Sequence, residues 1–91
     1  MMATIQEAAK SAMAFALESL GAERTKGIRL EEIESAMEGG LEVWRITLSM
    51  PDSSPMSFFA AAGGLRDYKT FAVVKATGEV LSMKIRELSK A

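Results

Sequence analysis

Two residue types that carry much of protein chemistry are missing from this chain, which has no cysteine and no histidine. Without cysteine there is no disulfide, no thiolate nucleophile and no cysteine-ligated metal. Without histidine the chain lacks the side chain that most often serves as a general base near neutral pH and as a transition-metal ligand. We therefore expect no metal and no cofactor, and an enzyme only of an unusual kind.

Other features are scarce. No apolar run approaches the roughly 20 residues that a membrane span needs, so we expect no membrane association. Residues 11–20 are apolar, but Glu7 and Glu18 flank them and no basic segment comes before them, which is unlike a secretory signal. We expect a cytoplasmic protein. Lys and Arg number 11 against 12 Asp and Glu. This balance offers no basic surface for nucleic acid.

What is present is typical of a small globular domain. The chain has 91 residues, of which 48% are hydrophobic and 25% charged. This length fits one domain, residues 1–91, and is too short for two.

The first element predicted is a helix over residues 4–20. Thr4 and Glu7 have the spacing of a capping box, in which each side chain bonds to the backbone N–H of the other residue. Gly21 stands where a helix often ends. The apolar stripe is rich in alanine, which favours helix and lets the helix axis lie close to its neighbour.

Two strands are predicted next, over residues 28–37 and 41–50. The apolar alternation of the first strand changes phase at Glu31-Glu32, where a β-bulge would restore it. Gly39 and Gly40 tolerate the positive φ of a tight hairpin turn. In the second strand Trp44 begins a strict alternation of apolar and other residues.

The most regular part of the chain is a second hairpin within residues 66–88. Two β-rich runs flank residues 76–79, where Gly78 can take the positive φ of the turn. Before it, residues 51–65 form a long irregular stretch with both prolines of the chain.

This order of elements predicts an α+β fold, with one N-terminal helix packed on a four-stranded antiparallel β-sheet. The residues expected to face the helix are Trp44, Ile46, Leu48, Phe71, Val73, Leu81, Met83 and Ile85. The residues expected on the opposite face are Val43, Arg45, Thr47, Tyr68, Thr70, Val74, Val80, Ser82, Lys84 and Arg86.

The closing hairpin also carries a family resemblance. Tyr68, Phe71 and Val73, then Thr77 to Leu81 reading Thr-Gly-Glu-Val-Leu, resemble the PepSY-like and cystatin-like small domains of bacteria. The resemblance extends to the layout of one Ala-rich helix followed by strands. It implies a non-enzymatic binding or inhibitory module on a curved sheet, and it carries over no catalytic residue.

Three groups of polar residues are candidate sites of chemistry. Glu31, Glu32 and Glu34 are interpreted as solvated charges that keep an edge strand from pairing with another chain. Ser53, Ser54 and Ser57 have no recognisable base beside them. The basic residues Arg45, Lys84 and Arg86 could gather near Tyr68 as a small nucleic-acid platform, but ordinary solvated strand positions explain them better.

More apolar surface is predicted than one helix can cover. We therefore predict a non-catalytic protein-interaction module, self-associating as a homodimer, with a further protein partner as another possibility. The phenylalanines of residues 51–65 would either complete the core or join this interface. An apolar-ligand pocket lined by Trp44, Phe71 and Met83 and a small enzyme remain alternatives. The residues predicted to form the interaction surface are Val43, Arg45, Met56, Phe58, Phe59, Tyr68, Val74 and Val80.

Overall fold

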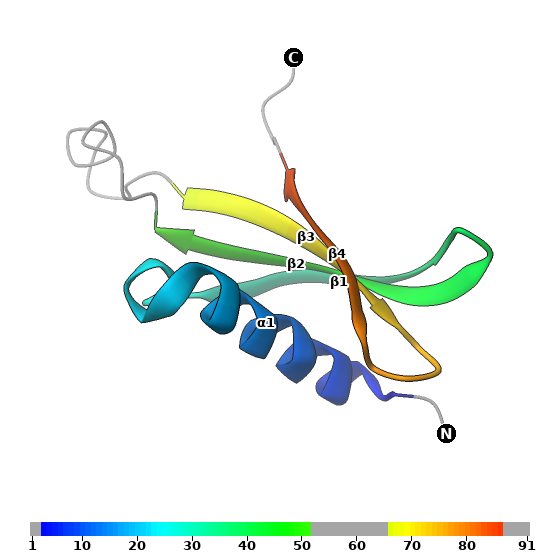
Figure 1. Ribbon diagram of the computed structural model, residues 1–91. Helices are drawn as coiled ribbons and strands as arrows, with labels where there is room; N and C mark the ends of the chain where they lie inside the picture. Colours follow the sequence, from blue (N-terminus) through cyan, green and yellow to red (C-terminus); the bar gives the residue numbers. More distant parts are fainter. Residues whose placement is uncertain (1–2, 52–65, 87–91) are drawn as a thin grey trace, which may run out of the picture.

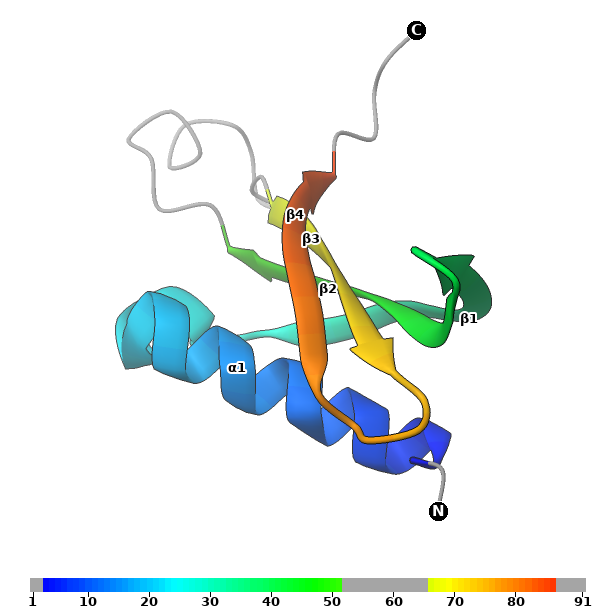
Figure 2. The same ribbon diagram turned by 45° about the vertical axis from the view of Figure 1, so that its right-hand side comes forward.

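The computed structural model describes residues 3–51 and 66–86. One helix lies against one face of a four-stranded antiparallel sheet whose strands follow the order of the chain, β1-β2-β3-β4 (Figures 1 and 2). The predicted α+β architecture is confirmed. The elements are α1 (Ile5–Thr25), β1 (Arg29–Glu38), β2 (Leu41–Pro51), β3 (Arg66–Val74) and β4 (Val80–Arg86).

Helix α1 begins as predicted and ends later than predicted. The Thr4 N–H donates to Glu7 Oε1 at 2.8 Å, and the Glu7 N–H donates to Thr4 Oγ1 at 3.1 Å, which completes the capping box. Gly21 does leave the helical conformation, with φ +91°, but the chain resumes the helix and continues to Thr25. The buried Thr25 hydroxyl donates to the Gly21 carbonyl at 2.9 Å and holds this added turn in place.

The first hairpin matches its prediction closely. β1 and β2 are joined by Gly39 and Gly40, whose φ values of +57° and +81° favour glycine. The pairing shifts by one residue between Leu30 and Glu32, so Glu31 occupies the predicted bulge. The bulge places Glu32 opposite Thr47, on the face away from the helix, and restores the alternation for the rest of the strand.

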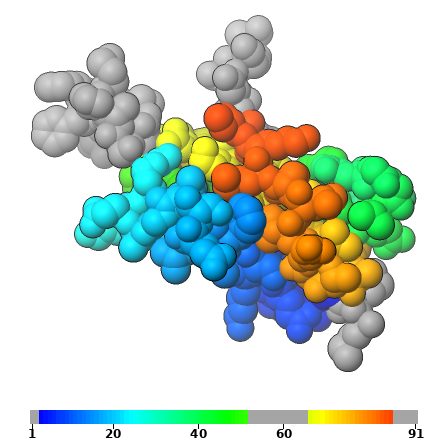
Figure 3. Space-filling model, in the orientation of Figure 1, coloured from blue at the N-terminus to red at the C-terminus, as the bar shows by residue number. Residues whose placement is uncertain are grey.

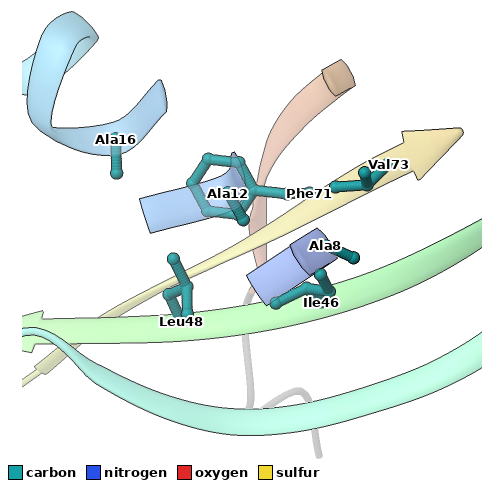
Figure 4. Close-up of a cluster of buried hydrophobic side chains, with 7 residues drawn as sticks. All are labelled: Ala8, Ala12, Ala16, Ile46, Leu48, Phe71 and Val73. Atoms are coloured by element: carbon teal, nitrogen blue, oxygen red, sulfur yellow. The ribbon is translucent and has the colours of Figure 1, made fainter. Parts of the chain in front are cut away.

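The main core lies between α1 and the two central strands (Figure 4). Phe71 meets Phe15 of the helix edge to face, with ring centroids 6.2 Å apart. The fully buried residues of the helix in this core are all alanines, and Met13, Phe15 and Leu20 pack beside them. The fully buried residues of this core are Ala8, Ala12, Ala16, Ile46, Leu48, Phe71 and Val73.

The second hairpin contains a bulge that was not foreseen. The pairing of β3 with β4 shifts between Ala72 and Val73, so that Val73 lies opposite Val80. Val80 therefore packs against the main core on the helix side, and its predicted place on the opposite face is wrong. The prediction failed because one inserted residue reverses the alternation beyond it. Leu81, expected to be covered by the helix, is 48% exposed.

Candidate interaction surface

The sheet face away from the helix does not present the apolar patch that the sequence suggested. Val43 and Val74 are cross-strand partners and, with Ala72, form a second small buried cluster against Ala36. Tyr68 is half-buried on the same face. Of the remaining predicted surface residues, Met56, Phe58 and Phe59 lie outside the described residues.

Arg45, another predicted surface residue, is held by two acidic residues of β1. Its guanidinium donates to Glu38 Oε2 through Nη2 at 2.9 Å and through Nε at 3.1 Å. Nη1 lies 3.4 Å from Glu34 Oε2. The hydrogen bonds to Glu38 and then to Glu34 raise the pKa of Arg45, against the opposing effect of its desolvation. These contacts tie β1 to β2 across the outer face and satisfy the Arg45 charge within the chain.

A second polar network lies at the corner where β2 ends and β3 begins. The buried Ser49 hydroxyl donates to Glu31 Oε2 at 2.6 Å and accepts from Arg66 Nε at 2.9 Å. Arg66 Nη2 also donates to the Gly27 carbonyl at 2.7 Å. The Ser49 hydrogen bond lowers the pKa of Glu31, burial opposes it, and the charges of Arg29 and Arg66 lower it further. The bulge of β1 therefore has a structural use, since it brings Glu31 to Ser49.

Arg24 of helix α1 also bonds to residues of this corner. Arg24 Nη2 makes an ion pair with Asp67 Oδ2 at 2.8 Å, and Arg24 Nη1 donates to the Pro51 carbonyl at 3.2 Å. Pro51, the last residue of β2, pairs with Arg66, the first residue of β3. Arg24 and Arg66 thus link the end of β2 to the start of β3.

Strand β4 combines an open edge with exposed apolar side chains. It is the last strand of the sheet, and none of the other described strands pairs with its outer side. The helix packs mainly over β2. Ile85 is therefore 76% exposed, and Leu81 is exposed nearby. Figure 3 shows β4 (orange) at the surface beside the helix (blue).

The opposite edge, β1, has a different chemistry. Four glutamates and one arginine occupy its ten residues, and Glu32 and Glu34 are exposed. Two apolar side chains of β1 remain open to solvent, Leu30 at 44% and Met37 at 61%. The β1 edge of the sheet is therefore acidic, whereas the β4 edge carries an exposed basic residue, Lys84.

The residues predicted to line an apolar-ligand pocket, Trp44, Phe71 and Met83, make contacts within the chain. Trp44 Nε1 donates to the Ala3 carbonyl at 3.1 Å, and Lys75 Nζ lies 4.2 Å from the centroid of its ring. Phe71 is fully buried, and Met83 packs against the main core. Within residues 3–51 and 66–86, no three acidic side chains are grouped so that they could hold a metal ion.

Comparison with known proteins assigns no family. No family model, no curated protein and no solved structure matches this chain. Among the described residues, no helix has both the length and the apolar character to cross a membrane.

Sequence reasoning missed the features that distinguish this surface. It placed Leu81 and Ile85 on the side that faces the helix, from the alternation of the strand, but the helix packs mainly over β2 and leaves both exposed. The Ser49 network gave no local signal, since Glu31, Ser49 and Arg66 are brought together only by the pairing of three strands.

Proposed function

We propose that this chain is a non-catalytic protein-interaction module that binds an extended protein segment along the outer edge of β4. The observation that carries the proposal is the 76% exposure of Ile85 on a terminal strand of the sheet. An edge strand offers unpaired backbone N–H and C=O groups, and an added strand satisfies them while its side chains cover exposed neighbours.

The side chains of β4 suit such a strand addition. Exposed Leu81 and Ile85 supply apolar contact, and Lys84 between them is exposed as a charge that can select the partner. The bulge near Leu81 limits the regular pairing surface to the later residues of the strand. We therefore place the backbone pairing at residues 82–86, with Leu81 adding side-chain contact beside it.

The remaining alternatives have less support. Phe71 is fully buried between helix and sheet, and Trp44 and Met83 pack against the same core, which favours a packed core over an apolar-ligand pocket. Glu31 and Arg45 have shifted pKa values, and the hydrogen bonds and ion pairs that shift them are structural contacts between strands. This arrangement favours a structural role over acid–base catalysis for both groups.

Two further parts of the proposal come from the sequence. The absence of cysteine supports a reducing compartment, and we propose the cytoplasm. The resemblance of the closing hairpin, Tyr68 to Leu81, to PepSY-like and cystatin-like domains also favours a binding role. Self-association, as a homodimer or a larger assembly, remains part of the proposal.

Site-specific photocrosslinking tests the binding edge. A photoreactive amino acid at Ile85 should give adducts with a protein, whether a second copy or another chain, when the purified protein is illuminated in a cell extract. The matched control carries the same group at Glu18, which is exposed on α1. Equal adduct yields from the two positions, or no adduct from Ile85, would contradict the proposal.

A further inference from the structure

We infer that the segment bound by β4 is strand β1 of a second copy of this chain, so that copies join head to tail. The inference rests on the proposed function, since it names the partner of the same edge. Three observations carry it: the opposite charges of the two edges, the faces on which those charges lie, and the apolar residues that accompany them, exposed Ile85 on β4 and half-buried Ile33 on β1.

The charges of the two edges are complementary. β1 exposes Glu32 and Glu34, whereas β4 exposes Lys84 and contains no acidic residue. Pairing β4 with β4 would bring two basic strands together, and pairing β1 with β1 would bring two acidic strands together. Like charges opposite one another destabilise a strand pair, and opposite charges stabilise it. Of the three edge pairings, β4 with β1 is the one that charge favours.

The strand register places the matching residues on the same face. Lys84 lies opposite Thr70, Thr70 opposite Thr47, and Thr47 opposite Glu32, so Lys84 and Glu32 share the face away from the helix. Glu34, two residues further along β1, belongs to that face as well.

The apolar residues match on the helix side of the sheet. Ile33 lies opposite Ile46, which lies opposite Phe71 and then Met83, so Ile33 and Met83 share this face, and Ile85 follows Met83 by two residues. An antiparallel pairing of Lys84 with Glu34 of the next copy sets Ile85 beside Ile33. A single register therefore pairs Lys84 with Glu34 on the face away from the helix and Ile85 with Ile33 on the helix side.

The topology determines the form of the assembly. The sheet has four antiparallel strands, so an antiparallel fifth strand from β1 of the next copy places that copy in the same orientation, with its helix on the same face. Each added copy leaves one β1 edge and one β4 edge free. Such heterologous contacts build closed rings or open chains. The mean length of open chains increases with protein concentration.

Charge reversal with rescue tests this interface. Lys84→Glu and Glu34→Lys should each weaken self-association by about tenfold, because each turns an attractive pair into a repulsive one. The double variant Lys84→Glu/Glu34→Lys restores opposite charges and should return to within about threefold of wild type. Solution mass is measured by light scattering over a dilution series from about 1 µM to about 1 mM.

Matched controls separate the interface from net charge. Lys10→Glu and Glu18→Lys make the same changes in charge at exposed helix positions and should leave self-association unchanged. Glu34 also contacts Arg45, so Glu34→Lys is checked for folding by circular dichroism. Ile85→Lys provides a second variant, since Ile85 is mostly exposed and its substitution should disrupt the interface without disturbing the fold.

The outcomes separate the inference from the proposed function. A wild type that stays monomeric over the whole range overturns the head-to-tail inference, and adducts of Ile85 with a different protein would then still uphold the binding edge. Self-association that Lys84→Glu and Ile85→Lys leave unchanged also overturns the inference, as does a double variant without recovery. Loss in each single variant with recovery in the double variant supports it.

Discussion

Ala12 offers the sharpest test of how tightly the helix packs on the sheet. It is fully buried in the middle of α1, between Ala8 and Ala16 and against the central strands (Figure 4). Replacing it with leucine adds three carbons at this contact. If space existed there, burying them would stabilise the fold by about 2.4 kcal/mol, at about 0.8 kcal/mol for each carbon. If the contact is filled, the helix must shift, at a cost of about 1–3 kcal/mol.

We expect the second result, so Ala12→Leu should lower the free energy of unfolding by about 1–3 kcal/mol. Urea unfolding followed by circular dichroism measures this change, and fluorescence of Trp44, the only tryptophan, gives a second probe. The melting temperature should fall by about 4–8 °C for each kcal/mol lost, a range typical of domains of this size.

The control is Ala14→Leu, on an exposed part of the same helix. Alanine and leucine differ little in helix propensity, so this variant should stay within about 0.5 kcal/mol of wild type. Stabilisation by Ala12→Leu would refute the close-packing argument. It would also mean that space exists between helix and sheet, and the apolar-ligand alternative would then regain support.

Two further predictions concern the strands. Because the pKa of Glu31 is lowered in the folded state, its contribution to stability is present above the ordinary carboxyl pKa and is lost as the pH falls through the lower folded-state value. Glu31→Gln should therefore flatten the acid side of the stability curve between about pH 5 and about pH 2, and curves parallel to wild type would contradict this. Gly40 has φ +81°, so Gly40→Ala should cost about 1–2 kcal/mol in urea unfolding. Gly40→Asn should cost less, because asparagine tolerates this conformation better, and equal losses would contradict the argument from φ.

Local sequence patterns determined most of the elements. Thr4 and Glu7 specify the helix start through contacts three residues apart, and Gly39-Gly40 specifies a turn through backbone freedom. The bulge at Glu31 was predictable because the apolar alternation changes phase there. These signals are local, since each depends on residues within one turn or one strand, and the antiparallel sheet with its packed helix follows from their order.

The tertiary structure alone decided which surfaces are open. Whether Val80 or Leu81 joins the core depends on a bulge whose position is set by pairing with β3, and the alternation of β4 alone does not show it. The exposure of Ile85 depends on where the helix crosses the sheet. Ser49 and Arg66 meet only because β2 and β3 pair at their ends. The candidate binding edge was therefore outside the reach of sequence reasoning, because exposure depends on contacts between residues far apart in the chain.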